Sequence, residues 1–92
     1  MSTAPPARIL TICNRRGLHA RSSAKFVKCV AEFNAEVKVS RDGQTVSGAS
    51  IMGLLMLGAA KGCDIEVSAE GPDAEAVLDA LAALVSGGFE ED

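Results

Sequence analysis

The chain has 92 residues, a length at which we expect one hydrophobic core and a single domain spanning residues 1–92. Hydrophobic residues make up 48% of it and charged residues 23%, so it can fill a packed core and lacks the composition of a disordered chain. The net charge of -3 has the wrong sign for a phosphate backbone, and without Trp or Tyr there are few aromatic rings on which bases could stack. We therefore expect no nucleic-acid partner.

The beginning of the chain predicts no export or membrane insertion. Residues 1–6 lack the basic segment and apolar stretch of a signal peptide, and no apolar run approaches the ~18 residues that a membrane helix needs. We therefore expect a cytoplasmic protein that does not bind membranes. The three cysteines stand far apart without a C-x-x-C pair, which argues against a disulfide framework. We expect Cys13, Cys29 and Cys63 to be reduced thiols packed as small hydrophobic side chains.

A strand and a helix are expected first. Residues 8–13 are rich in β-branched side chains and predict a strand with Leu10 and Ile12 on one face. From about residue 20 to 33, apolar residues recur at three- and four-residue steps, which predicts a helix with Asn34 as its C-cap. The expected buried face of this helix consists of Ala24, Phe26, Val27, Val30 and Phe33.

A hairpin and a short helix follow. Polar and apolar residues alternate over 36–41, as in a strand with one buried face. The dipeptide Asp42-Gly43 is a strong hairpin signal, so residues 44–47 should be the returning strand. About two turns of helix fit within residues 50–57.

The last part of the chain predicts a strand and a longer helix. Residues 63–70 alternate apolar and polar side chains. Residues 71–73, Gly-Pro-Asp, then end the strand and start a helix, which residues 87–88, Gly-Gly, end before an acidic tail at 89–92. The apolar stripe of this helix consists of Ala74, Val77, Leu78, Leu81, Leu84 and Val85.

The resulting order is β-α-β-β-α-β-α. Because the strands alternate instead of running continuously apolar, each should have one face in water. This pattern predicts an α/β (α+β) open-faced sandwich in which a four-stranded, mainly antiparallel sheet carries three helices on one face.

The only histidine, His19, lies between Gly17 and the expected start of the first helix. A helix start presents unpaired N–H groups and about half a positive charge, so it can bind an anion. The guanidinium of Arg16 or Arg21 could reach oxygens held near the imidazole, whose free lone pair can attack phosphorus or carbon. The residues alone leave a plain surface or capping role open. One histidine and scattered cysteines do not supply a metal site, and we expect no metal and no cofactor.

Three stretches of the chain resemble one known family. Gly-Leu-His-Ala-Arg at residues 17–21 resembles the active-site motif of HPr, the histidine-containing phosphocarrier of the phosphoenolpyruvate phosphotransferase system. Residues 50–57 and 60–71 resemble its later signatures, in the same order along the chain. The stretches 54–57 and 88–92 look more like the nitrogen-related branch of the family than the sugar-transport branch.

The resemblance implies a phosphocarrier and not a turnover enzyme. It implies that His19 accepts a phosphoryl group from an Enzyme I-type kinase and passes it to an Enzyme IIA-type acceptor, while Arg21 steadies the phosphoryl oxygens. Ser22 stands where the family motif commonly has proline, and its hydroxyl could bond locally or donate to the phosphoryl group. We expect the chain to act as a monomer.

Ser50 has two interpretations. A serine at this place is a favourable N-cap for the short helix. The resemblance also implies a regulatory site, which an HPr serine kinase/phosphorylase phosphorylates in many bacteria. A phosphate there would add roughly -1.5 to -2 charges next to the partner surface.

The helix at residues 50–57 is apolar nearly all round, so one face should remain exposed for a partner. The spacing places Leu54 and Leu57 toward the core, and Lys25 and Lys28 of the first helix could add a charged rim. The expected partner-binding residues are Ile51, Met52, Leu55, Lys25 and Lys28.

Two other classes of protein remain as alternatives. A small acyl-phosphate hydrolase could use the same arginine and helix start on an α/β sandwich. A ligand-sensing module of this size would bind a metabolite without being modified. An HPr of the sugar-transport branch is the alternative within the family.

Overall fold

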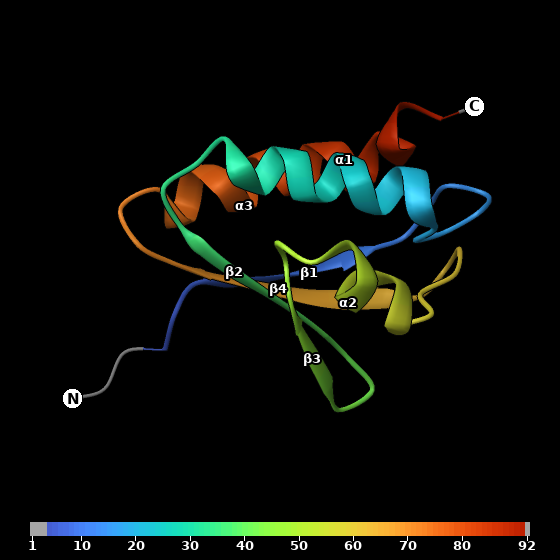
Figure 1. Cartoon of the computed structure of the whole chain (residues 1–92), viewed down its shortest axis with the longest axis horizontal. Helices are drawn as coiled ribbons and strands as arrows, with labels where there is room; N and C mark the ends of the chain where they lie inside the picture. Colours follow the sequence, from blue (N-terminus) through green and yellow to red (C-terminus); the bar gives the residue numbers. More distant parts are fainter. Residues whose placement is uncertain (1–3, 92) are drawn as a thin grey trace.

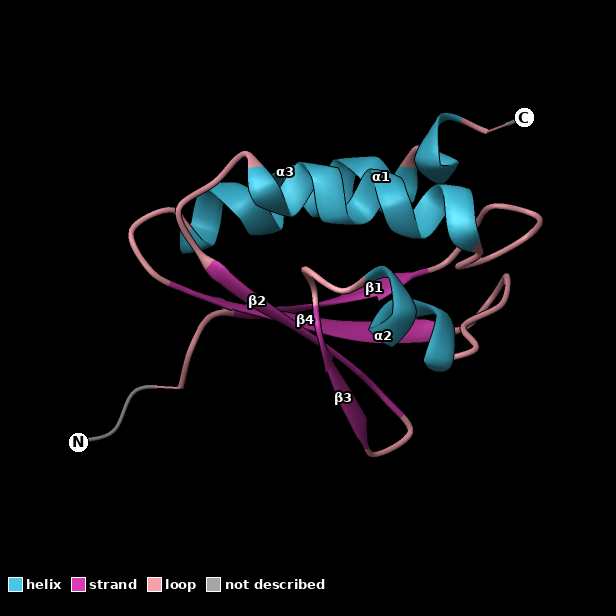
Figure 2. Cartoon of the chain, in the orientation of Figure 1, coloured by secondary structure: helices cyan, strands magenta, loops and turns pink. Residues whose placement is uncertain are grey.

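The chain folds in the predicted order of strands and helices (Figure 1, Figure 2). The computed structural model describes residues 4–91. Its elements are β1 (Ala7–Thr11), α1 (Ala20–Ala31), β2 (Glu36–Arg41), β3 (Gln44–Ser47), α2 (Ile51–Met56), β4 (Asp64–Glu70), α3 (Ala74–Ser86) and the short turn η1 (Gly88–Glu90).

The four strands form one sheet in the order β1-β4-β2-β3, and every neighbouring pair is antiparallel. Strand β4 therefore lies between β1 and β2, with Val67 opposite both Arg8 and Val39. The hairpin between β2 and β3 turns at Asp42 and Gly43, whose φ angles of 51° and 80° are both positive, as the tight two-residue turn requires. The predicted hairpin is confirmed.

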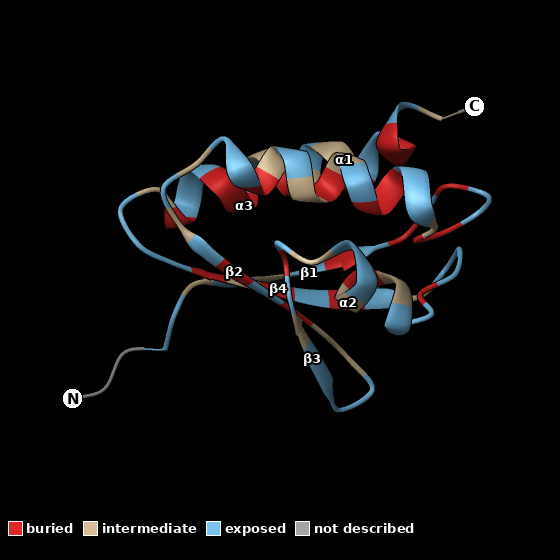
Figure 3. Cartoon of the chain, viewed as in Figure 1, coloured by how far each residue is buried: buried red, intermediate tan, exposed pale blue. Residues whose placement is uncertain are grey.

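Helices cover one face of the sheet. Figure 3 shows the buried residues gathered between the sheet and the pair α1 and α3. Leu54 of α2 and the C-cap of this helix, Leu57, are buried in the same core, as predicted, so the third helix packs on this side too. On the other face Ile9 is 62% exposed, and that face remains uncovered. These features confirm the open-faced α+β sandwich.

Helix α1 differs from its prediction at its end and on its buried face. It ends at Ala31 with Glu32 as the C-cap, so the prediction of Asn34 as C-cap was wrong. Ala24 is exposed, whereas Ser22 and Ser23 are buried together with Phe26 and Val30. The buried stripe is rotated toward the two serines, and the Ser22 hydroxyl can be buried there because it is hydrogen-bonded.

The cysteines are less buried than predicted. Cys13 is exposed, and Cys29 and Cys63 are only partly buried. Strand β1 ends at Thr11 and β4 begins at Asp64, so Cys13 lies past the end of the sheet. Its thiol is 3.2 Å from the Val85 carbonyl oxygen, at the end of α3.

The end of the chain is more ordered than the expected acidic tail. Residues Gly88–Glu90 form a short turn in which Phe89 is completely buried. The φ angles of Gly88, Phe89 and Glu90 are 65°, 55° and 61°, so three successive residues are left-handed. Asp92 lies outside the described residues. No helix within residues 4–91 has both the length and the apolar character needed to cross a bilayer.

Candidate functional site

The loop between β1 and α1 is held against the loop that follows α2. The Leu18 N–H donates to the Ala59 carbonyl at 2.9 Å. Gly17 has a φ of +65°, and a Cβ placed on it would lie 2.4 Å from the Ala59 oxygen. Only glycine fits this crossing, which fixes the position of the next residues.

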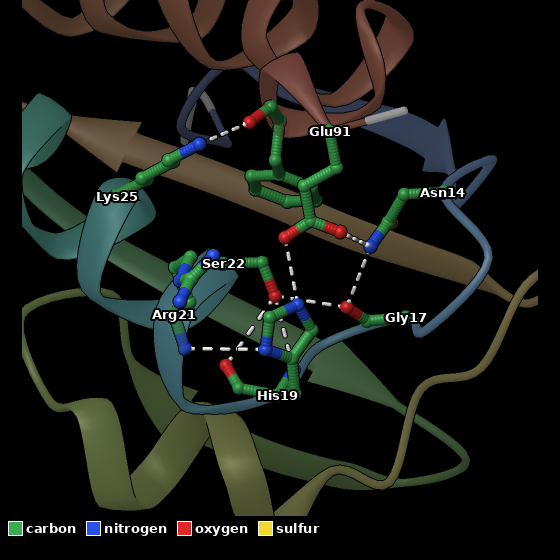
Figure 4. A network of polar contacts seen from close by, with 8 residues as sticks. Asn14, Gly17, His19, Arg21, Ser22, Lys25 and Glu91 are labelled. Carbon is green, nitrogen blue, oxygen red and sulfur yellow. Dashed lines mark hydrogen bonds and ion pairs between the residues drawn. The ribbon is translucent and has the colours of Figure 1, made fainter.

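His19 is the N-cap of α1, and its side chain is 20% exposed. Its Nδ1 accepts a hydrogen bond from the Arg21 backbone N–H at 3.2 Å. In return, the Ser22 hydroxyl accepts a hydrogen bond from the His19 backbone N–H at 3.0 Å. This reciprocal capping holds the imidazole over the first turn of the helix (Figure 4).

The Nδ1 atom carries the free lone pair of this ring. A backbone N–H can only donate, so a nitrogen that accepts from it is unprotonated. The lone pair of His19 therefore points into the helix start, where unpaired N–H groups and the helix dipole favour an anion.

The other ring nitrogen contacts a carboxylate from the end of the chain. His19 Nε2 lies 2.7 Å from Oε2 of Glu91. The second carboxylate oxygen, Oε1, accepts a hydrogen bond from Asn14 Nδ2 at 3.0 Å. Asn14 Nδ2 also donates to the Gly17 carbonyl at 2.9 Å, so the amide links the histidine loop to Glu91 (Figure 4).

The surroundings of Glu91 favour its ionised form. Burial by itself raises the pKa of this carboxyl, but hydrogen bonds from Asn14 and His19 and the positive charges of Lys25 and, when its ring is protonated, of His19 outweigh it. The net result is a pKa below the ordinary glutamate value.

A hollow of about 340 Å³ opens beside the imidazole. Although the whole chain has a net charge of -3, basic side chains outnumber acidic ones here. An anion of the size of a phosphoryl group would meet guanidinium and ammonium groups in this hollow. Its lining residues are Arg15, Arg16, His19, Arg21, Lys25, Glu90 and Glu91.

The structure places Ser22 and Lys25 beside His19. Ser22 is completely buried, and its hydroxyl donates to the Gly17 carbonyl at 2.8 Å, so its single hydrogen is already in use. The Lys25 ammonium donates to the Phe89 carbonyl at 2.6 Å. Lys28, by contrast, lines a groove between α1 and α3.

Helix α2 presents an apolar surface, which we call the α2 patch: Ile51, Met52, Leu55 and Met56. The exposed fractions are 38% for Ile51, 69% for Met52 and 66% for Met56, and Leu55 is partly buried. Met56 was not among the predicted residues. Helix α2 packs against α1, and the loop that follows it is hydrogen-bonded to the histidine loop, so the helix that carries the patch is a neighbour of the site.

Ser50 is the N-cap of α2. Its hydroxyl accepts a hydrogen bond from the Gly53 backbone N–H at 3.0 Å. The residue is partly exposed.

Sequence reasoning missed Asn14, Phe89 and Glu91, which take part in the contacts around His19, and also Arg15 and Glu90, which line the hollow. The only local signal was a lone phenylalanine after two glycines. It did not show that this phenylalanine is buried or that the next residues return to the histidine. Among residues 4–91, no cluster of three or more His, Cys, Asp or Glu side chains could hold a metal ion.

Comparisons with known proteins agree with this geometry. Residues 7–87 match the family model described as "PTS HPr component phosphorylation site". The chain is 44% identical to the phosphocarrier protein HPr of Cupriavidus necator over 91% of its length and 94% of the relative. It is also 44% identical to the phosphocarrier protein NPr of Shewanella violacea over 91% of its length and 92% of the relative.

Solved structures agree as well. The crystal structure of HPr-C-His from Thermoanaerobacter tengcongensis superposes with a TM-score of 0.90 at 37% identity, covering 95% of this chain and 98% of that one. The crystal structure of HPr from Bacillus anthracis gives a TM-score of 0.85 at 38% identity, covering 90% of this chain and 99% of that one.

Proposed function

The chain belongs to the HPr family, the phosphocarriers of the phosphotransferase system, and we propose that His19 is the residue that carries its phosphoryl group. An Enzyme I-type kinase would be the donor and an Enzyme IIA-type protein the acceptor. The observation that carries this proposal is the Nδ1 lone pair of His19, which points into the start of α1 beside a basic hollow.

The proposed reaction is transfer between nitrogen atoms. The Nδ1 lone pair of His19 attacks the phosphorus of a phosphohistidine on the donor. A new N–P bond forms while the donor's N–P bond breaks, and the electron pair of that bond returns to the donor's nitrogen. In a second exchange of the same kind, a nucleophile of the acceptor attacks the phosphorus, the N–P bond of His19 breaks, and its electron pair returns to Nδ1. Positioning and electrostatics provide most of the catalysis in such a step.

Arg21 would steady the phosphoryl oxygens. Its side chain is exposed and lines the hollow, so the guanidinium can reach an oxygen on Nδ1 without displacing a buried group. Ser22 would act by holding the histidine backbone, since its hydroxyl hydrogen already bonds to Gly17. Direct donation from Ser22 to the phosphoryl group would require that bond to break.

One experiment tests the proposal. The protein is incubated with labelled phosphoenolpyruvate and Enzyme I, and acid-labile label is measured. We expect about one phosphoryl group per chain, none in His19→Ala, and slower labelling in Arg21→Ala than in Lys38→Ala, which removes an equal charge from an exposed position on β2. Continuous release of inorganic phosphate would indicate a hydrolase, and an unlabelled chain a ligand sensor.

Membership of the nitrogen-related branch is also part of the proposal. The stretches 54–57 and 88–92 support it, whereas relatives named both HPr and NPr match the chain equally well. The phosphorylated protein should transfer its group faster to a nitrogen-type than to a sugar-type Enzyme IIA. The opposite preference would assign it to the sugar-transport branch.

The α2 patch is the proposed docking surface for the kinase and the acceptor. Met52→Glu places a charge on its most exposed side chain, so phosphorylation by Enzyme I should slow by about tenfold or more. Ile9→Glu is the matched control, because Ile9 is 62% exposed on the uncovered sheet face. Equal effects of the two substitutions would contradict docking at α2.

Regulation through Ser50 is a separate part of the proposal. A phosphate at the start of α2 would add negative charge next to the α2 patch and disfavour an acidic partner. Ser50→Asp should therefore slow phosphorylation by Enzyme I more than Ser50→Ala does. Mass spectrometry of protein from cells that never finds Ser50 modified would remove this part.

A cytoplasmic monomer is the form in which we propose that the protein works.

A further inference from the structure

Glu91 contacts the imidazole on the side away from the helix start. Its Oε2 lies 2.7 Å from His19 Nε2, and only 16% of its side chain is exposed. Its Oε1 accepts a hydrogen bond from the Asn14 amide, which donates its other N–H to the Gly17 carbonyl. A flipped Asn14 would place its oxygen against two acceptors, so this orientation of the amide is fixed.

The two sides of the ring impose the same tautomer. An ionised carboxylate can only accept, so the hydrogen in the contact with Glu91 belongs to Nε2. The Arg21 N–H can only donate, so Nδ1 must be unprotonated. Reversing the tautomer would place two donors together at Nδ1 and two acceptors together at Nε2.

The end of the chain is built to hold this carboxylate in place. Phe89 and Glu90 have left-handed backbones, which residues with a Cβ seldom adopt unless their surroundings impose it. Phe89 is completely buried, and the Lys25 ammonium donates to its carbonyl at 2.6 Å. The Glu91 N–H donates to the Gly88 carbonyl at 3.0 Å. The anchored turn aims the next side chain, Glu91, at the histidine (Figure 4).

We propose that Glu91 is a positioning residue for phosphoryl transfer, because it keeps the hydrogen of His19 on Nε2 and leaves Nδ1 as the nucleophile. This inference rests on the proposed role of His19. When Nδ1 bonds to phosphorus, Nε2 keeps its hydrogen and the ring becomes positively charged. The carboxylate of Glu91 lies against that charge, much as a buried aspartate supports the histidine of a hydrolase triad.

The test reads the tautomer directly in the unphosphorylated protein. Nitrogen-15 NMR of His19 is recorded in mildly alkaline buffer for the wild type, Glu91→Ala and Glu66→Ala. The last variant is the control, since Glu66 is an exposed carboxylate opposite Ile9 on the uncovered face of the sheet, away from the hollow. We expect a protonated Nε2 and an unprotonated Nδ1 in the wild type and in Glu66→Ala, and a mixture of tautomers in Glu91→Ala.

The rate of phosphorylation by Enzyme I is measured on the same samples. Glu91→Ala should be slower by about tenfold or more, the size expected for one charge-assisted hydrogen bond, while Glu66→Ala should stay near the wild-type rate. Amide spectra of the sheet residues check that each variant is folded. If Glu91→Ala does not fold, Glu91→Gln takes its place. The glutamine amide has only one oxygen, so it cannot accept both the hydrogen bond from Asn14 and the one from His19 as the carboxylate does.

Three results would overturn the inference. These are an unchanged tautomer in Glu91→Ala, the same change of tautomer in Glu66→Ala, and an altered tautomer with an unaltered rate in Glu91→Ala. Failure of the proposed function looks different. In that case the wild type itself takes up no label, while the nitrogen-15 spectra still report the contact between Glu91 and the ring.

Discussion

Ser22 shows how one buried hydroxyl can organise the start of a helix. It accepts from the His19 backbone N–H and donates to the Gly17 carbonyl, so it joins the loop to the first turn of α1. The neighbouring Ser23 is equally buried, but its hydroxyl has no hydrogen-bond partner among the described residues. The two serines therefore differ in what their hydroxyl groups contribute to stability.

We predict that Ser22→Ala lowers the free energy of unfolding by about 1–2 kcal/mol, because two backbone groups lose their partner. Ser23→Ala should change it by no more than about 0.5 kcal/mol, because it removes a buried polar atom that is not hydrogen-bonded. Urea unfolding of both variants measures the difference. Equal losses would show that the Ser22 hydroxyl does not hold the loop.

The sequence predicted His19 and Arg21 at the residue scale because their motif is local and contiguous. Glu91 could not be predicted in this way, since 72 residues separate it from His19 and only the folded chain brings them together. The exposure of Cys13 and the partial burial of Cys63 could not be predicted either, because they depend on where β1 ends and where β4 begins.

Among the elements, the turn η1 combines an unfavourable backbone with a favourable side chain. A left-handed residue with a Cβ costs roughly 1–2 kcal/mol, and two such residues follow Gly88. Complete burial of Phe89 contributes roughly 1.5–3 kcal/mol in return. The turn is therefore stabilised mainly by the buried Phe89 ring, by the hydrogen bond from Lys25 to the Phe89 carbonyl and by the contact of Glu91 with His19.

The close crossing of the loop before α1 with Ala59 predicts that a larger residue at position 17 destabilises the protein. Gly17→Ala should lower the free energy of unfolding by about 2 kcal/mol or more, because it combines a left-handed backbone with a Cβ only 2.4 Å from the Ala59 oxygen. Gly43→Ala has a similar backbone, with φ of +80°, but open space around it, and should lose about 1 kcal/mol. Thermal or urea unfolding compares them, and equal losses would contradict a role for the crossing with Ala59.

Strands β2 and β3 were predicted with their observed bounds because alternation and the Asp-Gly turn are local signals. The buried face of α1 was predicted incorrectly at Ala24, since periodicity weighs apolar residues and ignores hydrogen-bonded serines. The turn η1 was missed because its backbone is stable only when Phe89 has a core to enter. Local patterns therefore predict the elements, and packing decides their faces and ends.

At the scale of the whole molecule, segments from both ends of the chain meet at one site. Asn14, His19 and Lys25 come from the first third of the chain, and Phe89 and Glu91 from its last residues. Strand β4 ends beside the start of β1, and α3 then packs along β1 so that its end lies next to Cys13. Stability and site geometry are therefore linked through Glu91.

This link predicts a pH dependence. The pKa of Glu91 is lowered in the folded protein, so its contribution to stability is complete above the ordinary glutamate value of about 4.3 and is lost as the pH falls through the lower folded value. The groups that face it are Asn14, His19 and Lys25. The stability difference between wild type and Glu91→Gln should therefore be large near neutral pH and shrink in acid. Urea unfolding across this range measures it, with Glu90→Gln as control. A difference that does not change with pH would show that ionised Glu91 is not stabilised by these contacts.

The position of His19 as a helix cap has an energetic consequence for a carrier. The Nδ1 atom that would bond to phosphorus is the same atom that now satisfies the Arg21 N–H. Phosphorylation would remove this cap, worth about 1 kcal/mol, and supply an anionic oxygen in its place, worth a similar amount at a helix start. Gain and loss nearly cancel at this cap, so the helix start itself would favour neither the loaded nor the unloaded protein.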